Sequence, residues 1–518
     1  MNANVTLVLL LPLTGLVASL LVWRRPQWQT PVAAVASSLH LVAATALLLE
    51  VGRHGTQVAH VGSWPAPYGI VLVVDTLSAL MVWLTALLGL LTVLTSAAEI
   101  DRRQVELGFH PLLQLLLFGV CGAFVTGDLF NLFVFFEVML MGSFVLLAMA
   151  GGPSQLEGTV KYVVLNLFAS ALFLIGAGLA YGLTRTLNMA HLHLALPEVA
   201  ASHPTATLAM GAFLLLAFGV KAGVFPLYFW LPTSYHTPAP VISALFAGVL
   251  TKVGVYALLR LATVLAPASA PLLRGMLWVA ALTMLCGVLG AVSQKHVRRI
   301  LGFHSLSQIG YMIVGVGLVA SPDPSVRVLG LASTVLYLVH HLVVKTNLYL
   351  VGGTARLLLG SEELAFTGGL ARRTPWLAAA FLVSAFSLAG LPPLSGFWAK
   401  LAVLQAGALA SAWPAVMAAA LAGVLTLVSM LKIWHEVFWK NAPSTAASPV
   451  ALTRRECWLR GLPIAVLAVG TLSIGLWPAP LYDLAERAAA ELTDPAGALR
   501  VVAPQAPADA IPMETDSP

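Results

Sequence analysis

Long apolar stretches separated by short polar breaks make up the chain from its first residues to about residue 480. A helix that crosses ~30 Å of hydrocarbon needs about 20 predominantly apolar residues. The pattern predicts such helices at 5–23, 31–51, 71–98, 110–126, 129–150, 159–184, 206–231, 239–261, 271–293, 299–320, 328–352, 376–408, 413–439 and 462–480. The sequence therefore predicts an all-α, polytopic membrane protein with about fourteen transmembrane helices.

The composition excludes a soluble fold. Of 518 residues, 59% are hydrophobic and 9% are charged, whereas soluble domains contain about 25% charged residues. The run from Val5 to Trp23 could be taken for a signal peptide, but Arg24 and Arg25 follow it instead of preceding it. We therefore expect this run to be the first spanning helix.

The basic residues are distributed unevenly between alternate loops. One set of loops holds fifteen of the 27 basic residues: Arg24, Arg25, Arg102, Arg103, Lys161, Lys295, Arg298, Arg299, Arg356, Arg372, Arg373, Lys440, Arg454, Arg455 and Arg460. Cytoplasmic loops of membrane proteins carry such an excess. Both termini are therefore predicted on the non-cytoplasmic side, and this placement explains the net charge of +6 without nucleic acid as a partner.

The lysines within helices suggest an internal repeat. Lys221 and Lys252 lie 31 residues apart, Lys400 and Lys432 lie 32 apart, and the two pairs are offset by 179 to 180 residues. Each half then holds five helices, and an odd number inverts the second half in the membrane, as in many transporters. The alternative is a chance alignment of a few lysines.

Two helix breaks support the repeat. Lys221 precedes a Gly/Pro interruption in the seventh helix, and Lys400 follows one in the twelfth; paired broken helices usually flank a transport site. The predicted division is 1–108 for three N-terminal helices, 109–261 and 270–440 for the repeats, 461–480 for the last helix and 481–518 for a weakly ordered, Ala/Pro-rich tail.

Glu137 is predicted near the centre of the fifth helix, where an ionised carboxylate costs several kcal/mol unless it is paired or hydrated. Lys221 and Lys252 are candidates for buried amines that titrate, because desolvation favours the neutral amine and a nearby carboxylate favours the ammonium. Opening or closing a pair between Glu137 and Lys221 would release or load a proton. A static ion pair between helices is the alternative.

His340 and His341 lie mid-helix, and Lys345 follows His341 by one turn on the same face. We favour His341 for a relay between Lys252 and Lys400, because histidine titrates near neutral pH. His340 then hydrogen-bonds a neighbouring helix. A metal site is the rival for the two histidines, but the sequence shows no second cluster of ligands.

Lys400 is the candidate for the far end of the proton path, with snorkelling towards the interface as the alternative. Lys432 and Glu436 are expected to form a local pair, and Asp75 and Asp128 are expected to cap helices. Among other polar residues, Ser305, Ser307 and Gln308 could hold waters between lysines or serve helix packing.

No motif indicates a cofactor. The sequence contains no phosphate-binding loop, nucleotide fingerprint or haem-ligand pattern, and three cysteines at Cys121, Cys286 and Cys457 form no disulfide or zinc framework. We expect neither a cofactor nor a metal, and the chain is not expected to be an enzyme.

Several segments resemble the Mrp-type multisubunit monovalent cation (Na+)/proton antiporters, their D-type subunits in particular, and these are related to the antiporter-like subunits of respiratory complex I. The resemblance spans roughly residues 70 to 440 and is carried by Thr126–Glu137, Lys221–Pro232, Pro240–Gly254 and Leu391–Lys400. It implies fourteen helices, two inverted five-helix repeats and a hydrated polar axis at the midplane. Its functional residues fall on Glu137, Lys221, Lys252, His341 and Lys400.

The resemblance implies a proton-translocating component that works with other membrane subunits of a hetero-oligomeric complex in the lipid bilayer of a bacterial cell (inner) membrane. The protons would move down the proton motive force while the complex exports Na+ or a similar cation. A redox-driven proton pump of the complex I or hydrogenase type is the alternative, and a structural membrane scaffold is a third. Flavin and iron-sulfur proteins among the partners would indicate the redox pump.

Overall fold

The computed structural model describes residues 3–64, 66, 68–266, 268–443, 451–494, 497, 499 and 502. Within them, twelve helical segments are long and apolar enough to cross a membrane. They are α1 Ala3–Leu21, α2 Pro26–His54, α3 Thr76–Ser96, α6 Leu129–Ala148, α7 Pro153–Thr184, α9 Pro204–Ala222, α11–η2–α12 Pro240–Leu265, α13 Ala270–Ser293, α14 Val297–Leu318, α15 Pro324–Leu359, α19–η4 Trp413–Trp439 and α20 Arg454–Leu476.

Two shorter apolar helices, α5 Phe109–Val125 and α17 Pro375–Ala389, complete the set. They stand where the pattern predicts spans at 110–126 and 376–408, so all fourteen predicted positions are occupied. The seventh and twelfth spans are broken as predicted, since α10 Trp230–Ser234 follows α9 and α18 Ser395–Leu409 follows α17. Short helices α4 Arg102–Glu106, α16 Leu370–Arg373, η1 Val61–Ser63 and η3 Leu364–Phe366 lie in connections.

The prediction that the third helix begins at residue 71 is wrong. Residues Val71–Val74 form strand β2, which pairs antiparallel with β1 Gln57–His60. The β-branched valines favour a strand, and the Asp75 carboxylate then accepts a hydrogen bond from the Ser78 amide as the N-cap of α3. Asp128 caps α6 in the same way through the Asn131 amide. Both predicted caps are confirmed.

The tail was predicted to be weakly ordered from residue 481, and this is wrong for its first part. Helix α21, Ala479–Leu492, packs against α15 and α3, because Ala485, Ala488, Ala489 and Leu492 form one buried face. Small alanine side chains on one face let the helix pack closely. The high Ala/Pro content of the whole tail suggested disorder because it does not show that the alanines share one face. Most of 495–518 lies outside the described residues. A second unpredicted helix, α8 Met189–Ser202, lies between α7 and α9.

The two repeats pack through corresponding glycines. A Cβ atom at Gly119 would lie 2.6 Å from the Met139 amide, and one at Gly287 would lie 2.3 Å from the Ser307 amide. Both members of the second pair lie 168 residues after those of the first. The break glycines Gly223 and Gly390 differ by 167. The lysine offset of 179 to 180 is therefore not the structural offset. Lys221 and Lys400 lie on opposite sides of corresponding breaks.

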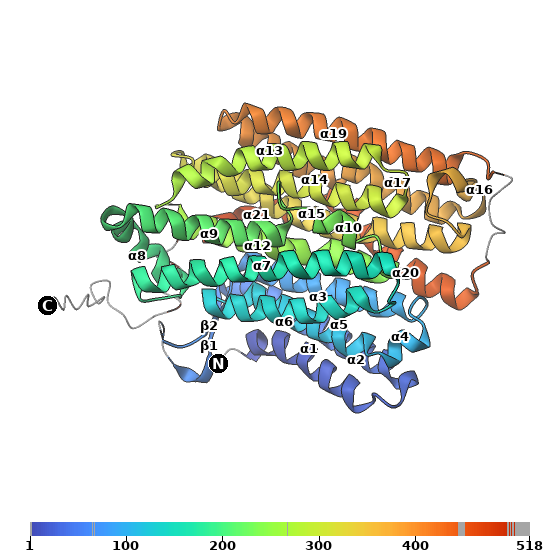
Figure 1. Ribbon diagram of the computed structural model, residues 1–518, viewed down its shortest axis with the longest axis horizontal. Helices are drawn as coiled ribbons and strands as arrows, with labels where there is room; N and C mark the ends of the chain where they lie inside the picture. The colour runs from blue at the N-terminus through green and yellow to red at the C-terminus, as the bar shows by residue number, and fades with distance from the viewer. Residues whose placement is uncertain are drawn as a thin grey trace.

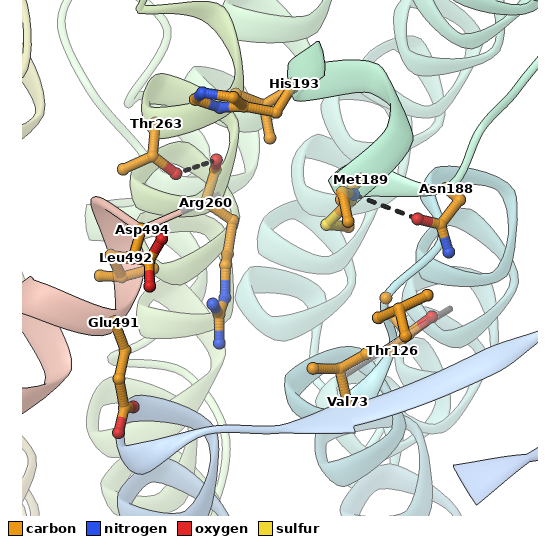
Figure 2. Close-up of a pocket in the computed structure, with 14 residues that line it drawn as sticks. Val73, Thr126, Asn188, Met189, His193, Arg260, Thr263, Glu491, Leu492 and Asp494 are labelled. Carbon is orange, nitrogen blue, oxygen red and sulfur yellow. Dashed lines mark hydrogen bonds between the residues drawn. The ribbon is translucent and has the colours of Figure 1, made fainter. Parts of the chain in front are cut away.

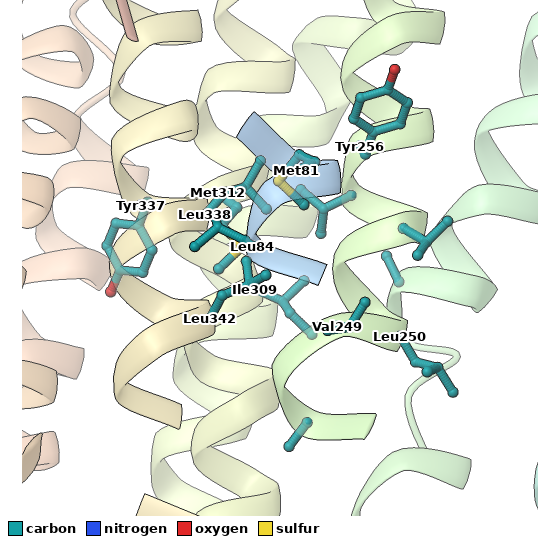
Figure 3. Packing of buried hydrophobic residues seen from close by; sticks show 14 of the residues in the cluster. Met81, Leu84, Val249, Leu250, Tyr256, Ile309, Met312, Tyr337, Leu338 and Leu342 are labelled. Carbon is teal, nitrogen blue, oxygen red and sulfur yellow. The ribbon is translucent and has the colours of Figure 1, made fainter. Parts of the chain in front are cut away.

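The helices lie side by side in one bundle, with β1, β2, α8 and the start of α1 at one end and α4 and α16 at the other (Figure 1). Apolar side chains of α3, η2, α14 and α15 fill its centre (Figure 3). The spans Pro240–Leu265, α14 and α15 are almost entirely surrounded by protein, whereas α1, α2 and α20 expose much of their apolar surface. The exposed faces suit lipid or other membrane helices. The central spans carry the polar residues described next.

Candidate functional site

The two helix breaks place lysines in the interior of the bundle. Helix α9 ends where Gly223 adopts a φ of 79°, and α17 ends where Gly390 adopts a φ of 95°. A helix end leaves carbonyl groups without intrahelical partners, and Lys400 uses one of them, because its Nζ donates to the Ala389 carbonyl at 2.9 Å. Its amine also lies 5.0 Å from the ring centre of Tyr311. Lys400 therefore bonds to the break and does not snorkel to the interface.

Glu137 and Lys221 are joined by a serine. The Ser170 hydroxyl on α7 donates to the Glu137 carboxylate, and Lys221 Nζ donates to Ser170 Oγ at 3.0 Å. The Lys221 amine also lies 4.9 Å from the ring centre of Phe136. Lys221 is buried and Glu137 is half-buried. The predicted partners are thus brought together through one hydroxyl instead of by direct contact. Ser170 was not predicted as a site residue.

Lys252 lies directly after a π-helical turn, η2 Phe246–Leu250. Its Nζ donates to the Ala247 carbonyl and to Thr251 Oγ1, the latter at 3.2 Å. Two residues further, a Cβ at Gly254 would lie 2.5 Å from the Ala222 amide. Helices α9 and α12 therefore touch backbone to backbone beside Lys221 and Lys252. Turns of π-helix occur frequently at functional sites.

Lys345 and His341 continue the line on α15. Both are buried, and neither the Lys345 amine nor either His341 ring nitrogen has a hydrogen-bond partner among the described residues. The charge of Lys252 acts on both side chains. A Cβ at Gly248 of η2 would lie 2.3 Å from Thr346 Oγ1, so the π-helical turn packs next to Lys345. These contacts connect the two repeats.

Histidines lie between Lys345 and Lys400. His340 Nδ1 hydrogen-bonds Ser395 Oγ at 2.9 Å, which confirms that this histidine bonds a neighbouring helix. His304 on α14 bonds Ser429 Oγ at 2.6 Å, and the charges of Lys345 and Lys400 both act on it. His304 was missed. A histidine inside an apolar helix, one turn before Gln308, was the signal that could have found it.

The structure decides between the two alternatives for Ser307 and contradicts the expected pair of Lys432 and Glu436. The Ser307 hydroxyl donates to the Met284 carbonyl at 3.0 Å and faces α13, where Gly287 allows close approach; it serves packing. Lys432 does not pair with Glu436, because its amine donates to the Val292 and Gln294 carbonyls, while Glu436 binds Lys440. Lys432 bonds there because the last carbonyl groups of α13 have no partner within the helix.

Polar side chains thus recur through the bundle, and we call the set the polar axis. It comprises Glu137, Ser170 and Lys221 beside one break, Lys252, Lys345 and His341 where η2 packs against α15, and His304, His340 and Lys400 beside the other break. Buried polar atoms without partners are costly and are usually satisfied by ordered water. Among the described residues, His304, Gln308, His340, His341 and Lys345 each carry such an atom, as do residues elsewhere in the bundle. Across the described parts of the chain, no group of three or more His, Cys, Asp or Glu side chains could hold a metal ion. The arrangement suits protons passed between side chains and water.

Comparisons with known proteins show the family of the chain. Residues 126–426 match the model of a family described as NADH:quinone oxidoreductase/Mrp antiporter, TM. The chain is 40% identical over 450 residues to the D-type subunit of the Na(+)/H(+) antiporter of Alkalihalophilus pseudofirmus, covering 87% of this chain and 89% of that one.

Solved structures agree as well. A chain of the Mrp complex from Dietzia sp. matches with a TM-score of 0.87 and 33% identity, over 97% of this chain and 100% of that one. A chain of the membrane-bound sulfane sulfur reductase, an archaeal respiratory membrane complex, matches with a TM-score of 0.88 and 26% identity, over 96% and 99%. The fold is therefore common to antiporter and respiratory assemblies.

Proposed function

Since this chain belongs to the NADH:quinone oxidoreductase/Mrp antiporter transmembrane family, we propose that it is the proton-translocating subunit of a multisubunit Na+(monovalent cation)/H+ antiporter driven by the proton motive force. The observation that carries the proposal is the polar axis from Glu137 to Lys400. Isolated charges inside a membrane protein are rare and mark proton or ion pathways. Here lysines and histidines lie in line with one carboxylate.

The side chains of this chain perform the transfer. Lys221 is held by the Ser170 hydroxyl beside Glu137, so a proton that reaches this group is stabilised as an ammonium opposite a carboxylate. When the bridge opens, the ammonium loses that stabilisation and its proton passes towards Lys252. Each charge that crosses 100 mV is worth about 2.3 kcal/mol. A voltage of this size is enough to bias such a bridge.

The runner-up is a proton-pumping membrane component of a redox enzyme, which would use the same axis with another energy source. The higher identity to a D-type antiporter subunit, 40% against 26% for the sulfane sulfur reductase chain, favours the antiporter. We therefore propose partners that are membrane subunits of an Mrp-type complex, in a bacterial cell membrane. The excess of basic residues in alternate loops supports termini on the non-cytoplasmic side.

The experiment measures sodium-dependent proton movement by dye quenching in vesicles from an antiporter-deficient bacterium that expresses the whole gene cluster. We expect Na+ to dissipate the pH gradient with the wild-type complex. Glu137→Gln, which keeps the side-chain shape and removes the charge, abolishes this response, while co-purification shows an assembled complex. Full activity of an assembled Glu137→Gln or Lys252→Ala complex contradicts the proposal. No Na+ response, but proton pumping on adding an electron donor, indicates the redox pump.

A further inference from the structure

We propose that Glu491, on the C-terminal helix α21, is the outer proton-binding group of a route that leads from the non-cytoplasmic end of the bundle to Lys252. The inference rests on the proposed function, because it assigns an access path to the same axis. It stands on three observations, namely a polar ladder on α12, a hydrogen-bonded cluster that joins three elements, and a cavity at the surface.

The ladder consists of Lys252, Tyr256 and Arg260. They are spaced four residues apart and therefore lie on one face of α12, one helical turn above another. Lys252 is 0% and Tyr256 2% exposed, and the Arg260 side chain, 18% exposed, lines a cavity. The ladder begins at the midplane axis and ends at the end of the bundle that carries β2, α8 and α21.

The outer part of the ladder is one continuous hydrogen-bonded cluster. Arg260 donates to the Asp75 carboxylate at 2.6 Å and to Ser78 Oγ at 2.8 Å. Its Nε also donates to Tyr256 Oη at 3.0 Å, and Ser78 Oγ lies 2.9 Å from the same oxygen. The cluster thus connects a hydroxyl one turn from Lys252 with a carboxylate at the start of α3.

Glu491 on α21 binds next to this cluster, at Thr76, the residue that follows Asp75. Its two carboxylate oxygens accept from the amide and the hydroxyl of Thr76, each at 2.8 Å. Burial and the nearby charge of Asp75 raise the pKa of Glu491 above its usual value, although hydrogen bonds from Thr76 and the charge of Arg260 oppose the rise. At Asp75 burial acts to raise the pKa too, but Arg260 and Ser78 outweigh it and hold the pKa below its usual value. Of the two acids, Glu491 is the one that takes up protons first.

A cavity of about 90 Å³ adjoins the cluster, which is room for several water molecules. Arg260 and Glu491 lie on one side of it, and Thr126, Met189 and Asn188 lie on the other (Figure 2). Asn188 is 1% exposed, and its Nδ2 has no hydrogen-bond partner among the described residues. His193 and the exposed Asp494 complete the titratable groups in the wall. A polar, unpaired amide in such a wall is suited to bind water.

The proton balance of the route is simple. Glu491 takes a proton from water in the cavity, and the neutral amine of Lys252 finally becomes an ammonium. Between them, water beside Glu491 carries the proton to Ser78. The hydroxyls of Ser78 and Tyr256 then each accept one proton and donate another, and Tyr256 Oη turns its own proton away from the Phe124 carbonyl to which it donates in the structure. Arg260 keeps its charge and stabilises Asp75. In the structure Lys252 is turned to the Ala247 carbonyl, so the last step requires its flexible stem to swing towards Tyr256.

The test compares Glu491→Gln with Glu486→Gln in the dye-quenching assay. Glutamine preserves the shape of the side chain and an oxygen for Thr76, and Glu486 is an exposed residue on the same helix. We expect Glu491→Gln to slow antiport about tenfold at alkaline outer pH, where protons are scarce, and much less at neutral pH. Glu486→Gln has wild-type activity at both. An unchanged pH profile of an assembled Glu491→Gln complex overturns the proposal.

Tyr256→Phe tests the inner end of the route. It removes the hydroxyl that contacts Ser78 and Arg260 and donates to the Phe124 carbonyl, but it keeps the ring packed against the Phe124 ring. If both groups act in one path, the double variant is no slower than the slower single variant; additive losses contradict a single path. Glu137→Gln serves as reference: if that variant remains active, the proposed function fails, whereas an inactive Glu137→Gln with a normal Glu491→Gln overturns only the route.

Discussion

At the scale of single residues, the ammonium groups of the axis are bound by neutral oxygens. Lys252 and Lys400 donate to main-chain carbonyls, and Lys221 donates to a hydroxyl. A neutral oxygen stabilises an ammonium less than a carboxylate does. Lys252 and Lys400 are therefore buried without a bonded carboxylate that fixes their protonation, whereas Lys221 lies opposite Glu137 through the Ser170 hydroxyl.

The Ser170 bridge gives a prediction at this scale. Ser170→Ala removes the hydroxyl between Glu137 and Lys221, and hydrogen bonds to charged groups are worth about 1.5 to 3 kcal/mol. We expect antiport to fall at least about tenfold, while Ser170→Thr, which keeps the hydroxyl, retains most activity. Dye quenching with co-purified complexes measures both. Equal activity of the alanine and threonine variants would show that the bridge has no role.

The residues that sequence alone could find are those whose presence in a membrane is costly. Glu137, Lys221, Lys252, His341 and Lys400 stand out in apolar runs; four of them are buried and Glu137 is half-buried, and their role in proton transfer stays a prediction. Ser170 and Ser395 could not be found, because serine is common in transmembrane helices and only the fold decides which hydroxyl meets a charge. Ser307 is the opposite case, because the sequence singled it out as a candidate and the structure shows it in the packing interface with α13.

At the scale of elements, spans and breaks could be predicted because membrane thickness sets helix length and because glycine and proline mark interruptions. The β1–β2 hairpin, α8 and α21 could not, since they lie outside the hydrocarbon and no such constraint applies to them. The repeat offset was wrong because lysines were aligned instead of packing contacts. Gly119 packs on Met139 as Gly287 packs on Ser307, and these two contacts give the offset between the repeats.

Gly254 gives the prediction for packing. A methyl group there would lie 2.5 Å from the Ala222 amide, and overpacking typically costs about 1 to 3 kcal/mol. We expect Gly254→Ala to lower the thermal stability of the purified complex and to reduce antiport, because it separates the helices that carry Lys221 and Lys252. Gly178→Ala on α7, where no atom lies within 4 Å, is the matched control. Equal melting temperatures of the two variants would contradict this account.

At the scale of the whole molecule, the loops at one end of the bundle carry more basic residues than those at the other. The membrane orientation proposed from this difference can be tested with cysteines. Cys457 is exposed at the start of α20, whereas Cys121 is buried. We expect a membrane-impermeant maleimide to label Cys457 in inside-out vesicles but not in intact cells. Glu486→Cys in a Cys457→Ser background is labelled in cells instead. The opposite result places the termini in the cytoplasm.

The neighbouring positions of Lys252 and Lys345, with the charge of one acting on the other, have a consequence for kinetics. Two like charges repel strongly in a medium of low dielectric constant, so a charge on one amine disfavours a charge on the other. A proton then enters the second half only after the previous one has moved on towards Lys400. If the axis conducts protons as proposed, we expect conduction to be single-file, so that slowing the exit at Lys400 slows uptake at Lys221 without altering any group there.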